Sequence, residues 1–182
     1  MSKANRTKAA LLGHARQQFW SKGFSNVALR EIAGAAGVDV ALISRYFGSK
    51  RGLFDATLED LPTLDSRAIE NSDALIDVVV DLFVAAPRDG SRPSATTLIL
   101  VNAGDPEVGD AIRKLYDIKW QRQLHAIIGD EEKAALFTAA MFGMSVAEKR
   151  LHLSGIAPPQ SDAYRAQLRG ILTAALAIER AG

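Results

Sequence analysis

The chain has 182 residues, of which 48% are hydrophobic and 24% are charged, as in an ordinary globular protein of one domain or of two small ones. It contains no cysteine, which excludes disulfides, thiol nucleophiles and cysteine-bound zinc. The basic start of the chain lacks the apolar stretch of a signal peptide, and the longest apolar segment, 74–86, is interrupted by Asp77 and Asp81. We therefore expect a cytoplasmic protein that does not interact with a membrane.

The net charge of +1 is unevenly distributed. Residues 1–54 contain nine Lys and Arg against two Asp and Glu, a net +7, whereas residues 55–182 contain 13 bases and 19 acids, a net −6. Such asymmetry indicates an anionic partner for the basic segment. Charge alone is compatible with nucleic acid, with a membrane surface and with a simple solvated basic face.

Apolar residues recur every three or four positions through nearly the whole chain, and no stretch alternates as a strand would. We therefore expect an all-α fold. Gly23 is expected to end the first helix and Pro62 the fourth, while Asp39 and Ser49 are N-cap candidates. The first four helices are predicted at 7–22, 29–36, 40–47 and 49–61.

The rest of the chain is expected to contain longer helices, capped by Asp105, Asp130 and Ser161. Two prolines and a glycine predict a loop at 87–94, and the apolar segment 96–101 fits a strand or a buried helix, of which the helical context favours the helix. The four longer helices are predicted at 73–86, 105–128, 130–153 and 161–180. In the first of them we expect five side chains to point inward: Leu75, Val78, Val79, Leu82 and Phe83.

Residues 29–47, LREIAGAAGVDVALISRYF, predict two short helices joined by a tight turn, which is the helix-turn-helix arrangement. Gly37 supplies the positive φ that the turn needs, and Ile32 and Ile43 are placed where the two helices face each other. The second helix then buries Leu42, Ile43 and Phe47. Its outward face consists of small side chains and one arginine, a shape that fits a major groove: Val40, Ala41, Ser44 and Arg45.

Residues 11–54 resemble the DNA-binding domain of TetR-type (TetR/AcrR) transcriptional regulators. The matching residues include Arg30–Ala33, Ala36–Val38 and the step Tyr46–Phe47–Gly48–Ser49–Lys50. The resemblance implies a repressor that binds double-stranded operator DNA as a homodimer and is released by a small apolar or aromatic effector. It also implies two domains, a helix-turn-helix domain at 1–48 and a helical effector-binding and dimerisation domain at 49–182.

The resemblance also implies the residues that contact DNA. They are Arg30, Val40, Ala41, Ser44, Arg45, Tyr46 and Lys50. Arg45 is the long donor able to reach a guanine edge or a phosphate, and Lys50 lies where a helix start attracts a phosphate. Lys3, Arg6 and Lys8 are expected to form either an arm over the DNA or an inert tail.

The sequence departs from the family at two positions. Ala28 stands where a threonine usually caps the second helix, so Ser25 or Asn26 would have to replace that cap. Ser44 stands where the family often has a tyrosine, which shortens the contact and leaves Tyr46 as the nearest aromatic hydroxyl. The position of the domain on DNA is therefore less well defined by the sequence than the fold.

The last two helices predict a four-helix interface between subunits, because one is apolar on most sides and the other carries small residues. The predicted interface residues are Ala140, Gly143, Met144, Ala147, Leu168, Ile171, Leu172 and Ala175. The predicted effector site is lined by Phe83, Tyr116, Trp120, Met141 and Phe142. For both sets, packing within the domain's own core is the alternative interpretation.

Two other classes of function stay open. Glu148 and His152 have the spacing of two metal ligands on one helix face, but no third ligand is evident. We therefore expect neither an enzyme nor a cofactor. The remaining alternative is a helical adaptor for protein partners that keeps the helix-turn-helix as a scaffold.

Overall fold

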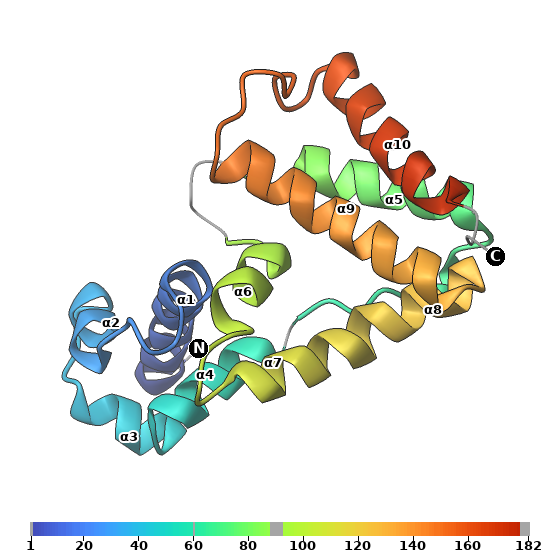
Figure 1. Ribbon diagram of the computed structural model, residues 1–182. Coiled ribbons are helices and arrows are strands. Elements are labelled where there is room, and N and C mark those ends of the chain that lie inside the picture. The colour runs from blue at the N-terminus through green and yellow to red at the C-terminus, as the bar shows by residue number, and fades with distance from the viewer. Residues whose placement is uncertain (1, 60, 88–92, 179–182) are drawn as a thin grey trace. The chain divides into compact units, whose positions relative to one another are not determined.

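The computed structural model describes residues 2–59, 61–87 and 93–178, and within these residues every regular element is helical (Figure 1). The expected all-α fold is therefore confirmed, and the segment at 96–101 is part of a helix. The elements are α1 (Lys3–Lys22), α2 (Leu29–Ala35), α3 (Ala41–Phe47), α4 (Lys50–Leu58), η1 (Ser66–Ala68), α5 (Ser72–Ala85), α6 (Ala95–Asn102), α7 (Gly109–Tyr116), η2 (Asp117–Gln121), α8 (Arg122–Ile128), α9 (Glu131–Lys149) and α10 (Asp162–Ala177).

The elements form two compact units, and the chain passes between them after Pro62, Ala86 and Leu115. The N-terminal unit contains α1 to α4, α6 and most of α7, and the C-terminal unit contains the other elements. This division differs from the predicted boundary after residue 48. The physical reason is that α4 and α6 both pack on α1 and supply fully buried residues such as Leu53 and Leu98 to its core.

Helix α1 begins earlier than predicted, because Ser2 caps it. The Ser2 hydroxyl accepts a hydrogen bond from the backbone N–H of Asn5 at 3.2 Å. Lys3, Arg6 and Lys8 therefore lie on the first turns of α1, and neither the expected arm nor the expected tail exists.

Aromatic side chains form the centre of the N-terminal unit. The rings of Phe19, Phe24 and Phe54 are all buried, with centroids 5.2 to 5.7 Å apart in tilted or edge-to-face pairs. Such pairs contribute about 0.5–1.5 kcal/mol each beyond the area that they bury. The indole N–H of Trp20 donates to the buried hydroxyl of Thr57 at 3.0 Å, so α1 and α4 are also joined by a polar contact.

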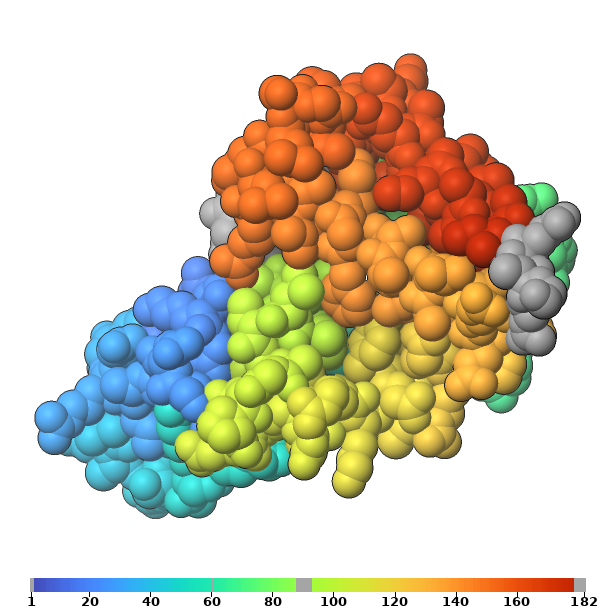
Figure 2. Space-filling model, in the orientation of Figure 1, coloured from blue at the N-terminus to red at the C-terminus, as the bar shows by residue number. Residues whose placement is uncertain are grey.

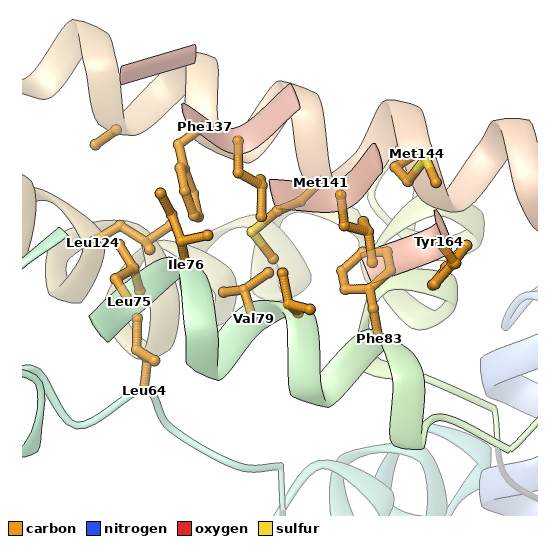
Figure 3. Packing of buried hydrophobic residues seen from close by; sticks show 14 residues of the cluster. Leu64, Leu75, Ile76, Val79, Phe83, Leu124, Phe137, Met141, Met144 and Tyr164 are labelled. Atoms are coloured by element: carbon orange, nitrogen blue, oxygen red, sulfur yellow. The ribbon is translucent and has the colours of Figure 1, made fainter. Parts of the chain in front are cut away.

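The core of the C-terminal unit lies between α5, α8, α9 and α10 (Figure 3). Leu75, Val79 and Phe83 of α5 are buried as predicted, but Val78 and Leu82 are 38% and 50% exposed, so that part of the prediction was wrong. Ile76 and Val80 are buried in their place. The buried arc of α5 therefore follows 75, 76, 79, 80 and 83, the a, d and e pattern of a helix with one covered side.

The predicted helix 105–128 is divided into three segments. The Asp105 carboxylate accepts hydrogen bonds from the backbone N–H groups of Glu107 and Val108 at 2.9 and 3.2 Å, but α7 starts only at Gly109. After α7, the π-helical turn η2 leads into α8, which ends at Gly129 in the left-handed conformation.

The remaining helix ends also differ from the predictions. Helix α9 ends at Lys149 instead of 153, and α10 ends at Ala177. Arg180 and the middle of the predicted loop, residues 88–92, lie outside the described residues. Within the described ranges, none of the helices combines the length and hydrophobicity that crossing a bilayer requires.

Candidate nucleic-acid interface

Helices α2 and α3 form the predicted helix-turn-helix. Gly37 has φ +66°, which a residue with a side chain rarely adopts, and Val38 donates its backbone N–H to the carbonyl of Ala33 at 3.0 Å. Ile32 and Ile43 are fully buried at the contact of the two helices. These contacts fix α3 against α2 and leave one side of α3 for a partner.

The outward side of α3 is exposed as predicted at Ala41, Ser44 and Arg45. Val40 is half-buried because it lies at the cap position before α3, where the Asp39 carboxylate accepts a hydrogen bond from the N–H of Ala41 at 2.7 Å. Arg45 therefore rises from a surface of small side chains, which is the shape that a major groove admits.

Two further basic side chains flank α3. Arg30 is exposed in the first turn of α2, and Lys50 is the half-buried first residue of α4. Among the described residues, neither Arg30 nor Arg45 has an acidic partner in an ion pair, so both guanidinium groups are available to an anion. In Figure 2 the side chains of α2 and α3, light blue to cyan, project from the N-terminal unit.

The ammonium group of Lys50 lies 4.5 Å from the centroid of the Phe24 ring, a cation–π contact. The start of α4 is fixed beside it, because the hydroxyl of Ser49 accepts a hydrogen bond from the N–H of Gly52 at 3.0 Å. Lys50 is therefore held near the helix start, where the helix dipole and free N–H groups favour an anion.

Tyr46 is half-buried, with its ring at an edge-to-face angle to Phe47. The ammonium of Lys8, a residue expected on either an arm or an inert tail, lies 5.6 Å from the Phe47 ring. Lys8 thus reaches the end of α3 from helix α1. The sequence feature that could have predicted this helix start is the N-cap residue Ser2.

The missing cap at Ala28 is not replaced. No side chain caps α2, because Ser25 bonds to Asp105 and the Asn26 amide donates to the carbonyl of Lys22 at 2.9 Å. Ser25 donates both its backbone N–H and its hydroxyl to Asp105, at 3.1 and 2.6 Å. Burial, the largest single influence, raises the pKa of Asp105, but the hydrogen bonds from Ser25 and from two backbone N–H groups together hold it below 3.8.

Of the predicted effector residues, Tyr116, Trp120 and Phe142 are half-buried, and the rings of Tyr116 and Phe142 lie 5.5 Å apart. The Tyr116 hydroxyl donates to Thr138 at 3.2 Å, and Thr138 donates to the side-chain carbonyl of Gln121 at 2.8 Å. Burial raises the pKa of Tyr116 above 10.0. The other two predicted residues, Phe83 and Met141, belong to the packed core of the C-terminal unit.

The predicted dimer residues also divide into two groups. Met144, Leu168, Leu172 and Ala175 are buried within their own unit, so their assignment to a surface between subunits was wrong. The physical reason is that α9 and α10 pack on each other, and that α10 also packs on α5 and α9 on α8. Gly143 and Ile171 are exposed, and Ala140 and Ala147 are half-buried, so these four stay at the surface.

The proposed pair of metal ligands is not on one helix face. Glu148 accepts a hydrogen bond from the hydroxyl of the buried Tyr164, whereas His152 lies beyond the end of α9 with φ +49°. In the described part of the chain, no three His, Cys, Asp or Glu side chains gather as metal ligands would.

A basic helix-turn-helix whose second helix has an exposed outward face is the arrangement found in helix-turn-helix DNA-binding proteins. Residues 11–57 match the model of the bacterial regulatory proteins, tetR family. The likeness to this family covers the segment that contains α2, α3 and most of α4.

Curated relatives include the HTH-type transcriptional regulator BetI of Escherichia coli, in strains K12 (DH10B) and SMS-3-5. Both are 26% identical to the chain over 103 residues, which are 57% of this chain and 48% of the relative. The chain therefore spans about half the length of the curated relatives it matches.

Solved structures with a similar fold include NalD, the secondary repressor of the MexAB-OprM multidrug efflux pump in Pseudomonas aeruginosa, with 18% identity and a TM-score of 0.69. The match covers 95% of this chain and 97% of NalD. HlyIIR, a hemolysin II transcriptional regulator, matches with 17% identity and a TM-score of 0.62 over 94% of this chain and 98% of its own. At these identities the likeness shows the fold.

Proposed function

We propose that this chain is a sequence-specific DNA-binding regulator that binds operator DNA as a homodimer. The observation that carries the proposal is the exposed face of α3, on which Arg45 rises from small side chains between two further bases, Arg30 and Lys50. In this proposal the regulator is a repressor that acts on DNA in the cytoplasm and is released by a small molecule. The similar folds of NalD, a repressor, and HlyIIR, a transcriptional regulator, support this assignment.

The interface residues have different roles in this proposal. Arg45 takes a guanine edge or a phosphate, while Ala41, Ser44 and the partly covered Val40 give the groove room for close approach. Arg30 and Lys50 bind phosphates on either side of the recognition helix, and Tyr46 offers its hydroxyl to the backbone. Phosphate contacts position the domain on DNA and base contacts read its sequence, so the two kinds of contact have separate tests.

We assign the homodimer surface to the outer sides of α9 and α10. Gly143 and Gly170 lie inside these helices, are exposed, and have open space where a side chain would begin. A glycine inside a helix costs about 0.8–1 kcal/mol relative to alanine, and on α9 and α10 it leaves room for another helix to come close. In this proposal the two positions let the helices of a second subunit approach closely. Exposed small residues recur at four-residue spacing along the same two surfaces: Ala135, Ala139 and Gly143 on α9, and Ala166, Gly170 and Ala174 on α10.

We assign the effector site to the half-buried pair Tyr116 and Phe142 and to Trp120, which packs against the core cluster that contains Phe83 and Met141. The aromatic rings suit a small apolar or aromatic molecule. The hydroxyls of Tyr116 and Thr138 provide a polar end that can exchange their mutual hydrogen bond for one to a ligand.

A salt series tests the DNA-binding proposal. Two subunits bring six phosphate-binding candidates, three from each chain, which predicts that log K falls with log salt with a slope of about −5. Arg45→Gln and Lys50→Gln should each reduce this slope by about 1.8 per dimer, while Lys114→Gln, an exposed lysine of α7, should leave it unchanged. A flat salt dependence of the wild-type protein would refute the proposal.

Selection from a random DNA pool tests sequence specificity. The wild-type protein should enrich a two-fold symmetric site, because a homodimer presents two copies of α3. Arg45→Gln should relax the base preference at one position in each half-site. Lys50→Gln, in contrast, should weaken binding to all sequences alike. Enrichment of the same site by wild type and Arg45→Gln would remove Arg45 from base recognition.

A further inference from the structure

The segment 102–107, at the end of α6, contacts the chain just before α2 and the start of α4, the two segments that flank the helix-turn-helix. Asn102 is the last residue of α6 and is fully buried, although its side chain is polar. Its amide nitrogen donates to the carbonyls of Phe19 at 3.1 Å and Leu98 at 2.9 Å, and its amide oxygen accepts from the backbone N–H of Phe24 at 2.7 Å. Three of the four hydrogen bonds that this amide can make are therefore used.

These bonds determine where Phe24 lies. The end of α1 turns at Gly23, which has φ +91° and where a Cβ would lie 3.2 Å from the carbonyl oxygen of Val101. Helix α6 thus approaches the α1–α2 connection as closely as a glycine permits (Figure 1). Because the Phe24 N–H is held by Asn102, the Phe24 ring is fixed in the aromatic centre with its outer side under the ammonium of Lys50, 4.5 Å away.

The residues after Asn102 add two parallel contacts. Asp105 accepts both hydrogen bonds from Ser25, the residue after Phe24. The carbonyl of Glu107 accepts from the guanidinium of Arg51 at 2.9 Å, and Arg51 follows Lys50 in the first turn of α4. The segment 102–107 therefore holds the connection before α2 and the start of α4, the two places that carry the proposed phosphate contacts.

We propose that Asn102 and Asp105 are positioning residues for DNA binding. They touch no DNA themselves, and they act by holding Phe24 and Ser25 so that the Lys50 ammonium lies where a phosphate meets the start of α4. This inference depends on the proposed function, because it assigns to Asn102 an effect on a phosphate contact. It predicts that the effect of Asn102 on DNA affinity passes through Lys50.

A double-mutant cycle with a short mixed-sequence DNA duplex tests this, since phosphate contacts are independent of sequence. Asn102→Ala should weaken binding by up to about eightfold per subunit at 0.1 M salt. This is the contribution of one phosphate contact at 0.1 M salt, if that contact contributes no affinity at 1 M salt. The salt slope should fall by up to about 0.9 per subunit. In a Lys50→Gln background, Asn102→Ala should change neither the affinity nor the slope.

Thr57→Val is the matched control, because Thr57 is also fully buried and in the same unit, but has its hydrogen bonds with Trp20 and Phe54. It should lower stability and leave the salt slope unchanged in both backgrounds. If circular dichroism shows that Asn102→Ala does not fold, Asp105→Ala, a substitution nearer the surface, replaces it in the cycle with the same expected coupling.

The outcomes separate the two proposals. A flat salt response of the wild-type protein would refute DNA binding, and the inference with it. If the wild-type response is steep and Asn102→Ala lowers the DNA affinity equally in the wild-type and the Lys50→Gln background, the inference alone is refuted. A Lys50→Gln variant that binds as the wild type does would also refute the inference.

Discussion

The substitution Gly143→Leu separates the fold of a single subunit from the association of two. Gly143 lies in the middle of α9, and a Cβ built there meets no atom of its own chain within 4 Å. Leucine is close to alanine in helix propensity, so the substitution should stabilise α9 by about 0.7 kcal/mol within a subunit. Far-ultraviolet circular dichroism should show the same helix content as for the wild type.

The association should respond in the opposite direction. Helices that meet through glycine and alanine can approach more closely than the usual 8–10 Å between axes, and a leucine at the contact prevents this. Overpacking costs about 1–3 kcal/mol per site, and a two-fold axis repeats the substitution in both subunits. The expected loss of about 2–6 kcal/mol raises the dimer dissociation constant by at least roughly 30-fold.

Sedimentation equilibrium over a range of protein concentrations measures this constant. The control is Gly13→Leu, since Gly13 is likewise exposed inside a helix, α1, and has open space around it. The control should remain dimeric, and Gly143→Leu should become a folded monomer with weaker operator binding. A Gly143→Leu protein with the wild-type dissociation constant would show that this side of α9 is not the interface.

Three further predictions follow from single positions. Gly52→Ala should destabilise the protein by about 2 kcal/mol or more in denaturant unfolding, because a Cβ would lie 2.1 Å from the carbonyl oxygen of Phe47; an unchanged midpoint would contradict the contact. Ala28→Thr should add the missing cap of α2 and raise the free energy of unfolding by about 1 kcal/mol, and no gain would mean that the backbone there does not admit the cap. Burial raises the pKa of Tyr116 above 10.0, so the unfolded chain ionises first and the stability from this group, present below about pH 10, is lost as the pH rises through the folded-state pKa. Tyr116→Phe should remove this part of the pH dependence between about pH 9 and 11, and identical profiles would refute it.

Local features could be predicted from the sequence because their causes are local. Ser49, Asp130 and Ser161 each accept a hydrogen bond from an N–H three residues ahead, so the residue type and its place before an apolar run were enough. The same holds for the turn at Gly37. Ser2 shows the limit of this reasoning. The residues that follow it are mostly polar, so no periodic pattern of apolar residues marks the start of α1.

Contacts across the chain could not be predicted in this way. Asn102 bonds to residues 78 and 83 positions away, and nothing in its own neighbourhood distinguishes it from a surface asparagine. The division of the chain was missed for the same reason. The apolar side of α1 needs α4 and α6 to cover it, and only packing in three dimensions shows that segments so far along the chain provide the cover.

The predicted dimer surface shows how a correct helix can be paired with the wrong side. Bulky apolar residues on α10 indicated that something must cover them, and Leu168 and Leu172 are indeed covered, but by α5 and α9 of the same subunit. One exposed row on each helix consists of small residues, among them Gly143 on α9 and Gly170 on α10. Counting large apolar side chains assigned the buried side of α10 to the partner, whereas the proposed interface is the opposite side, where the small residues lie. If this interpretation is right, Leu172→Ala should lower the stability of the subunit by about 2–5 kcal/mol, and Gly170→Leu should affect only association.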